Sequence, residues 1–192
     1  MEVNKTPSIH DSSWLCYQLL YGTKEEIIEE LMDCYGEELK RLVYTYTKSW
    51  TQAEDIIQDV FVNVYLHLES FSGQSSLRTW IYSIAINACR DYKRSWHVKH
   101  IHVTSTFFNQ GTFYGTPESQ FLQKDEQSHM MERIMSLPLK YREMILLYYY
   151  KEFSIEEISL LTKLNPSTVK TRLKRAREKL HSRLKGLRGD IQ

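Results

Sequence analysis

The stretch STVKTRLKRAREKL, Ser167–Leu180, predicts a helix with one apolar face and a strongly basic remainder. From Pro166 to Arg188 there are nine Lys and Arg residues and a single acid, Glu178, so the local net charge is +8, although the 192-residue chain carries only +1. Because the positive charge is concentrated in this one segment, it indicates a surface for an anionic partner. The apolar residues recur at spacings of three and four: Val169, Leu173, Ala176, Leu180 and Leu184.

A shorter helix is predicted directly before this one. SIEE, Ser154–Glu157, has the spacing of a capping box, and the turn TKLN follows the helix that it opens. Asn165 can then cap the basic helix, with Pro166 in its first position. A short helix, a tight turn and a longer helix form a helix-turn-helix, and the small polar residues that begin the second helix suit the DNA major groove. The pattern therefore favours DNA binding over the alternative, a solvated basic face on a terminal helix.

The rest of the chain is also predicted to be helical, because it has few Gly and Pro residues and no alternating strand pattern. A capping box in TQAE, Thr51–Glu54, is predicted to open a helix with Ile56, Val60 and Val64 on its buried stripe. Another helix is expected from near Leu77. The predicted fold class is all-α. Two further expectations concern single residues: Trp80 as a core residue and Pro138 in the first position of an apolar helix.

A change of composition predicts a flexible linker between two small helical domains. Residues 97–123 hold only two formal charges and several helix-breaking Gly and Pro residues. The stretch is also long for a loop inside one domain. The predicted organisation is a disordered extension at 1–13, a first domain at 14–96, the linker at 97–128, a second domain at 129–187 and a tail at 188–192.

Several classes of protein are excluded by what the sequence lacks. No apolar run is long enough to span a bilayer, and the N-terminus has no signal peptide, so we expect a cytoplasmic protein without membrane insertion. No phosphate-binding loop and no catalytic constellation appears, so we do not expect an enzyme. The three cysteines, Cys16, Cys34 and Cys89, form no close pair and are interpreted as reduced thiols, with a redox sensor as the alternative.

One cluster of histidines raises the possibility of a metal site. His97, His100 and His102 lie close together in the sequence and imidazole is a common metal ligand. No Cys, Asp or Glu lies within the cluster, so we predict neither a metal nor another cofactor. A metal-responsive factor and a metal-dependent enzyme stay as alternatives to this interpretation.

Two long segments resemble one known family. LPLKYREMILLYYYKEFSIEEISLLTKLNPSTVKTRLKRAREKL is similar to region 4 of bacterial sigma factors of the extracytoplasmic-function (ECF) group, and AEDIIQDVFVNVYLHLESFSGQSSLRTWIYSIAINACRDYKR is similar to their region 2. The resemblance extends from about residue 14 to residue 186, with both motifs in the family's order. It implies a protein that binds core RNA polymerase, directs it to promoter DNA and helps to melt the DNA, in a stress or envelope response. It also implies an anti-sigma protein as a partner. The alternative is a stand-alone helix-turn-helix regulator.

The resemblance also implies three sets of binding residues. One set docks on the clamp coiled coil of the polymerase: Asp55, Gln58 and Asp59. A second set binds the −10 element, with bases held by Phe71, Gln74, Ser75 and Asn87, and phosphates held by Arg78, Arg90, Lys93 and Arg94. The third set reads the −35 element: Ser167, Thr168, Lys170, Thr171, Arg172, Lys174 and Arg175.

Overall fold

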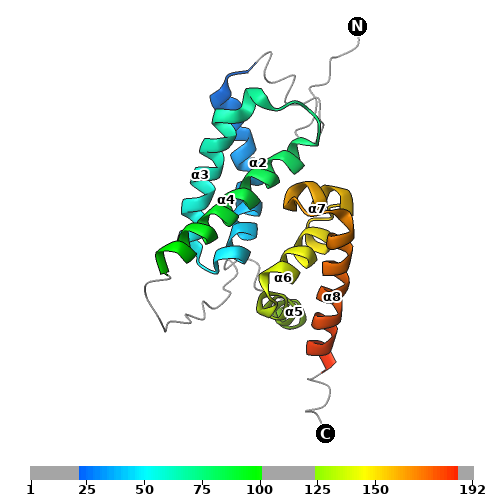
Figure 1. Cartoon of the computed structure of the whole chain (residues 1–192). Helices are drawn as coiled ribbons and strands as arrows, with labels where there is room; N and C mark the ends of the chain where they lie inside the picture. The colour runs from blue at the N-terminus through cyan, green and yellow to red at the C-terminus, as the bar shows by residue number, and fades with distance from the viewer. Residues whose placement is uncertain (1–21, 101–123, 186–192) are drawn as a thin grey trace. The chain divides into compact units, whose positions relative to one another are not determined.

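A computed structural model describes residues 22–100 and 124–185, and all of their regular structure is helical, which confirms the all-α prediction (Figure 1). These residues form two compact units, one on each side of residues 101–123. The predicted extension at 1–13, the tail at 188–192, Cys16, His102 and most of the predicted linker lie outside the described residues. So do the side chains of His97 and His100. Within the described ranges, no helix is long and apolar enough to cross a membrane.

The first unit consists of α2 (Lys24–Thr47), α3 (Trp50–His67), the short 3₁₀ turn η1 (Leu68–Ser70) and α4 (Leu77–His100). The three long helices pack on one another around a common core. The predicted stripe of α3 is confirmed, because Ile56, Val60 and Val64 are buried. The helix expected from near Leu77 is also confirmed, although it continues to His100, four residues into the predicted linker. Other buried side chains come from α2 and α4: Ile27, Leu31, Tyr35, Leu39, Ile81, Ala85 and Ile86.

The start of α3 differs from the prediction. Its N-cap is Ser49, whose hydroxyl accepts a hydrogen bond from the backbone N–H of Gln52 at 3.4 Å. The capping box predicted at Thr51–Glu54 is therefore wrong by two residues. The reason is tertiary: Trp50 stacks on Tyr44 of α2, with ring centroids 4.2 Å apart, and Trp50 is already the first helical residue. A cap two residues later would leave this ring outside the helix.

The second unit consists of α5 (Lys124–Ser136), α6 (Leu139–Ile145), the π-helical segment η3 (Leu146–Tyr150), α7 (Ile155–Thr162) and α8 (Pro166–Lys185). Pro138 is the N-cap of α6 and Leu139 is its first residue, so the prediction for Pro138 is wrong by one position. The Pro138 carbonyl accepts from the backbone N–H groups of Tyr141 and Arg142. The core of this unit contains buried side chains from all five elements: Ile134, Met144, Leu147, Ile158, Leu161, Val169, Leu173 and Ala176.

The predicted helix-turn-helix is present in α7 and α8. Ser154 and Glu157 form the expected capping box, with the Glu157 backbone N–H donating to Ser154 Oγ at 3.1 Å. Asn165 caps α8 as expected, since its Oδ1 accepts from the Thr168 backbone N–H at 2.7 Å, and Pro166 is the first residue of the helix. The turn contains Lys163 in the left-handed conformation, with φ 53°. The seam of α8 toward α6 and α7 is buried as far as Ala176.

Candidate nucleic-acid interface

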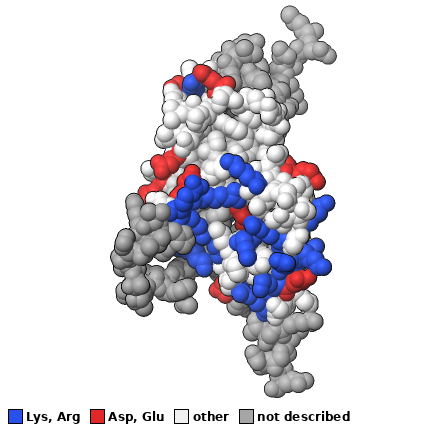
Figure 2. Space-filling model, in the orientation of Figure 1, with Lys and Arg blue, Asp and Glu red and all other residues white. Residues whose placement is uncertain are grey.

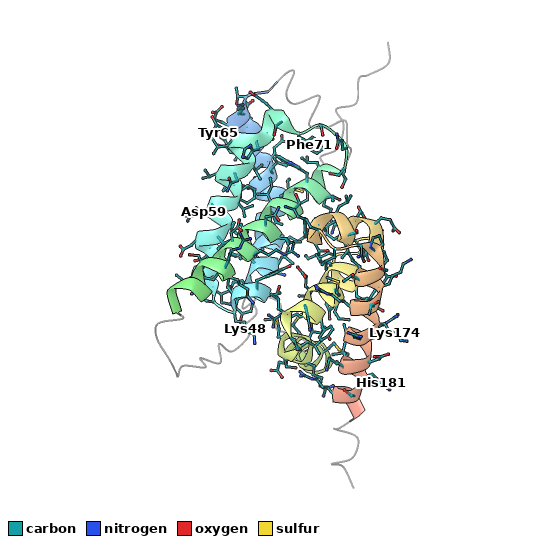
Figure 3. All side chains as sticks on the ribbon, viewed as in Figure 1. Lys48, Asp59, Tyr65, Phe71, Lys174 and His181 are labelled. Carbon is teal, nitrogen blue, oxygen red and sulfur yellow. The ribbon has the colours of Figure 1, made fainter. Side chains whose placement is uncertain are left out.

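The outer face of α8 carries all seven residues of the third predicted set. Thr168 and Arg172 are half-buried, and the other five are exposed. They lie opposite the seam formed by Val169, Leu173 and Ala176, because every side chain of the seam points into the unit. Lys and Arg side chains gather over this unit (Figure 2), and Lys174 points away from the helix bundle (Figure 3). The structure therefore keeps all seven outside the buried seam, and five of them line one hollow: Ser167, Thr168, Thr171, Arg172 and Arg175.

Local hydrogen bonds orient the hydroxyl groups at the start of α8. Ser167 Oγ donates to Asn165 Oδ1 at 2.7 Å, and Thr171 Oγ1 donates to the Ser167 carbonyl oxygen at 2.8 Å. Both hydroxyl hydrogens are thus used within the helix, and both hydroxyl oxygens can still accept from a ligand. Among the side chains that the structure describes, no carboxylate forms an ion pair with Lys170, Arg172, Lys174 or Arg175. The positive charge of this face is therefore open to an external anion.

An open hollow of about 310 Å³ lies between the start of α6 and this face of α8. It is lined by Lys140, Tyr141, Ser167, Thr168, Thr171, Arg172 and Arg175. Lys140 and Tyr141 were not predicted from the sequence, because no local pattern shows that the start of α6 packs beside the start of α8. Lys140 Nζ lies 5.1 Å from the centroid of the Tyr141 ring, and that ring is buried.

The residues of the second predicted set fall into two groups rather than one pocket. Phe71, Gln74 and Ser75 lie in the loop before α4, and Arg78 lies in its first turn. Asn87 lies ten residues after Leu77, about 15 Å further along the helix axis. The remaining residues of the set lie beyond Asn87, with Arg90 and Lys93 half-buried and Arg94 exposed beside Asp91 at 3.2 Å. An extended ligand such as a nucleic-acid strand is long enough to contact both groups.

The loop before α4 is shaped by a glycine and closed by a cap. Gly73 has a φ of +69°, a conformation that L side chains rarely adopt. Ser76 Oγ accepts from the Thr79 backbone N–H at 3.1 Å and so caps the start of α4. The Phe71 ring lies against the Trp80 ring, with centroids 5.3 Å apart and a tilt of 53°. Trp80 is half-buried rather than a full core residue, so part of its ring is accessible to a ligand.

Arg78 has partners inside the first unit. Its Nη2 lies 3.6 Å from Glu38 Oε1 on α2, and its guanidinium lies 5.3 Å from the centroid of the Tyr82 ring. The Tyr82 hydroxyl donates to the same Glu38 oxygen. Burial, together with this carboxylate, raises the pKa of Tyr82. Glu38 therefore holds the start of α4 against α2 and offsets part of the Arg78 charge.

The first predicted set, Asp55, Gln58 and Asp59, is exposed on one face of α3. Asp59 points outward from the unit (Figure 3). The same face continues toward the end of the helix with two apolar side chains that the sequence analysis did not include, Val62 and Leu66, which are 58% and 65% exposed. The signal was present in the sequence, because Val62 and Leu66 are four residues apart and so extend the otherwise polar side of an amphipathic helix as neighbours.

The described cysteines show no reactive environment. Cys89 is buried, and Cys34 is half-buried, where burial and the nearby Glu38 carboxylate raise the pKa of its thiol. A raised pKa lowers the thiolate fraction at neutral pH and so lowers reactivity. Among the described residues, no cluster of His, Cys, Asp and Glu suits a metal ion.

Comparison with known proteins agrees with this arrangement of two units. Residues 31–97 match the model of Sigma-70 region 2, and residues 129–180 match that of Sigma-70, region 4. The RNA polymerase sigma factor YlaC of Bacillus subtilis is 31% identical over 156 residues, which are 80% of this chain and 89% of YlaC. The chain belongs to the sigma-70 family. The ECF RNA polymerase sigma factor SigW of Bacillus subtilis is 29% identical over 85% of this chain and 91% of its own length.

Two solved structures share the fold of this sigma factor. One is the sigma factor RpoE from Bartonella quintana, crystallised with the anti-sigma factor NepR. Its TM-score to this chain is 0.71 at 23% identity, and the match covers 84% of this chain and 98% of RpoE. The other is CnrH in complex with the cytosolic domain of CnrY, with a TM-score of 0.62, 22% identity, and coverage of 92% of this chain and 99% of CnrH. The prediction of an ECF sigma factor is confirmed, and the stand-alone regulator is not favoured. The protein thus acts with core RNA polymerase on promoter DNA, and its family is one of transcription factors rather than enzymes.

Proposed function

We propose that this sigma factor reads its promoters with two separate surfaces, one in each unit, and docks on the polymerase with a third. The observation that carries the proposal is the outer face of α8, where basic and small polar side chains lie opposite a buried seam. Such a face can enter a groove of DNA without disturbing the packing of its own unit. The α7–turn–α8 geometry then makes α8 the recognition helix.

The −35 element is the proposed target of α8. The first turns of a recognition helix meet base edges in the major groove, where each base pair presents its own pattern of donors and acceptors. Arg172 and Arg175 suit the bidentate contact with guanine, while Lys170 and Lys174 suit phosphates. Ser167, Thr168 and Thr171 are small enough to let the helix approach the bases closely.

The −10 element is the proposed target of the loop before α4 and of the exposed side of α4. An unpaired base needs a ring to stack on and polar groups for its Watson–Crick edge. Phe71 with the accessible part of Trp80 supplies the ring, and Gln74 and Ser75 supply the polar groups. Further along the strand, we assign a base contact to Asn87. The phosphate contacts of this element are assigned to Arg78, Arg90, Lys93 and Arg94.

Docking on the polymerase clamp is assigned to Asp55, Gln58 and Asp59. Two carboxylates and an amide on one helical face are complementary to a basic helical partner and steer its approach. Val62 and Leu66 extend the same face with apolar surface, which a partner helix can cover. The relatives' ECF names also support action in a stress or envelope response. A cytoplasmic location is part of the proposal, supported by action on RNA polymerase.

An anti-sigma partner is part of the proposal. RpoE, which shares the fold, was crystallised with an anti-sigma factor, and CnrH, which also shares it, was solved in complex with the cytosolic domain of CnrY. We expect this chain to be held by a protein of the same kind, which would cover its DNA-binding surfaces. Co-purification from the native host, followed by loss of transcription when the captured partner is added back, tests this point.

Transcription from purified components tests the main proposal. The protein is added to bacterial core polymerase on fragmented genomic DNA, and the 5′ ends of the transcripts are sequenced. Start sites that share one −35 and one −10 sequence are expected. Arg172→Gln is then expected to relax preference within the −35 element, and Asp55→Asn with Asp59→Asn to weaken binding to core polymerase. Start sites without a shared sequence, or a double variant that binds core polymerase normally, would refute the corresponding assignment.

A further inference from the structure

The hollow between α6 and α8 has the chemistry of an anion site. Three of its lining side chains, Lys140, Arg172 and Arg175, are cationic, and none is acidic. Three like charges around one hollow repel one another, and in the described part of the chain no carboxylate pairs with them. A bound anion would offset this repulsion more strongly than solvent screening does.

Lys140 is the lining cation that does not belong to α8. It lies in the first turn of α6, two residues after the Pro138 cap, and the buried Tyr141 ring lies 5.1 Å from its ammonium. A cation over an aromatic face is attracted to it, and Lys179 Nζ also lies 5.7 Å from the centroid of the same ring. Lys140 is exposed, so its ammonium can reach a ligand, and the hollow places it beside the start of the recognition helix.

We propose that Lys140 and the start of α8 form a clamp for one backbone phosphate of the −35 element, so that α6 contributes to DNA binding from outside the helix-turn-helix. The proposal rests on the function proposed above for α8. When a recognition helix lies in the major groove, the segments beside it face the sugar–phosphate walls of that groove. Lysine binds phosphate as a point charge, without the two-pronged geometry that arginine uses on guanine. Lys140 therefore adds affinity and fixes the position of α8, but it does not read sequence.

Lys140→Gln tests the clamp in the holoenzyme, on a promoter identified by start-site mapping. Each phosphate neutralised by a protein cation contributes about 0.9 to the slope of log affinity against log salt concentration. The slope for the variant is therefore expected to be about 0.9 smaller in magnitude than the slope for the wild type. The ratio of wild-type to variant affinity should then fall about three-fold between 50 and 200 mM NaCl. The loss is expected to be equal for the native −35 sequence and for single-base variants of it.

Arg177→Gln is the matched control, because it removes the same charge from the same unit. Arg177 lines a different, mostly apolar hollow with Leu180 and His181, away from Lys140. It is expected to keep the wild-type salt slope. An equal reduction of the slope in both variants would mean that only the total charge matters, and this result would overturn the clamp.

Neutral phosphate substitution identifies the ligand. Promoter fragments with a single methylphosphonate at each backbone position flanking the −35 element are bound by wild-type and Lys140→Gln holoenzymes. At one position the wild type is expected to lose about three-fold to ten-fold in affinity, as for one phosphate contact, while the variant loses nothing further. If both proteins lose affinity at the same positions by the same factors, the clamp is refuted.

Two outcomes separate this proposal from its alternatives. If Lys140→Gln weakens binding to core polymerase in the absence of DNA, the hollow holds an acidic group of a protein and the phosphate assignment is wrong. If the wild type shows no preference among −35 variants and Arg172→Gln changes nothing, the proposed role of α8 fails first. A failure confined to Lys140 leaves that role intact.

Discussion

In the α2–α4 unit five basic side chains lie against carboxylates of the same unit, whereas in the part of the chain that the structure describes the basic side chains on the outer face of α8 do not. Lys24 Nζ lies 2.8 Å from Glu69, Lys40 Nζ lies 3.0 Å from Glu37, and Arg41 Nε lies 3.1 Å from the same carboxylate. The cations of α8 have Glu178 as the one acid in their helix. The chain has a net charge of only +1, although its two units differ in how their surface charges are paired.

This difference separates what each unit can bind. Paired charges cancel within a few ångströms, so the ion-paired part of the first unit's surface has a weak field at a distance. Unpaired cations produce a field that attracts polyanions and accelerates their encounter. Repulsion between the basic side chains of the second unit lowers its stability, but it leaves their charge free to bind DNA.

The largest expected effect comes from cavities in the two cores, each of which should destabilise only its own unit. Leu39→Ala in the first unit and Ile158→Ala in the second each remove a fully buried side chain. Each is expected to lower the free energy of unfolding of its own unit by about 2–5 kcal/mol, from lost burial and the remaining cavity. The other unit is expected to keep its stability, because the two form separate compact units.

Hydrogen exchange with mass spectrometry measures both units at once. A second probe is specific to the N-terminal part, since all four tryptophans lie there: Trp14, Trp50, Trp80 and Trp96. Fluorescence unfolding should therefore respond to Leu39→Ala and not to Ile158→Ala. Exchange that rises in both units after either substitution would show that they unfold together rather than independently.

The next largest effect concerns the link between α2 and α4 in the first unit. Tyr82→Phe removes the hydroxyl that donates to Glu38, and it is expected to cost about 1.5–3 kcal/mol, the range for a hydrogen bond to a charged group. The second unit should be unaffected, as judged by its exchange rates. Glu38→Gln is the control, since it keeps an acceptor but removes the charge, and it should cost less than Tyr82→Phe.

Alkaline pH sharpens the same prediction. The folded-state pKa of Tyr82 is raised from the ordinary value of 10.0, and burial raises that of Tyr35 to about 12. Stability from these groups is therefore complete below pH 10 and falls as the pH rises further, since only the unfolded chain ionises there. The fall is up to about 1.4 kcal/mol per pH unit for each tyrosine. Tyr82→Phe should show a shallower fall above pH 10, and an unchanged slope would argue against the burial of this hydroxyl.

Local sequence patterns predicted the second unit more accurately than the first. The capping box at Ser154, the cap at Asn165 and the position of Pro166 depend on residues within three positions of each other, and all three are confirmed. The start of α3 depends on Trp50 stacking on Tyr44, a contact between two helices, and the local pattern placed it two residues late. Pro138 was misplaced by one position because a proline can both precede a helix and begin it.

The candidate site shows the same limit. The residues on α8 were predictable, because one helix carries all of them at a regular spacing. Lys140 was not, since its place beside α8 is set by the packing of α6, and Arg78 was assigned to DNA without its partner Glu38, which lies forty residues earlier. Contacts within one helix can be read from spacing, whereas contacts between helices need the fold.

A smaller effect is expected where each unit ends a helix on a strained lysine. Lys48, after α2, has a φ of 59°, and Lys163, after α7, has a φ of 53°. Glycine adopts this conformation without steric cost, so Lys48→Gly and Lys163→Gly are each expected to stabilise their own unit by about 1 kcal/mol. Thermal unfolding measures the gain. Alanine at the same positions is the control and should not stabilise, because it keeps the strain. If the alanine and glycine substitutions stabilise equally, loss of the lysine charge explains the gain instead.

The smallest effect tests the difference in charge pairing directly. Lys170 and Lys174, and Arg175 and Lys179, are like charges one helical turn apart, and each such pair costs about 0.2–0.5 kcal/mol at low salt. Raising NaCl from 20 to 500 mM shortens the Debye length from roughly 20 Å to about 4 Å, so this repulsion should fade and the second unit should gain stability. The first unit should gain nothing or lose slightly, because its surface ion pairs are screened too.

Hydrogen exchange at both salt concentrations separates the units. Arg175→Gln removes one of the repulsive pairs and should reduce the gain in the second unit, whereas Arg41→Gln should not. Equal gains in both units would mean that salt acts on the chain in general, and that the unpaired charge of α8 costs the fold nothing.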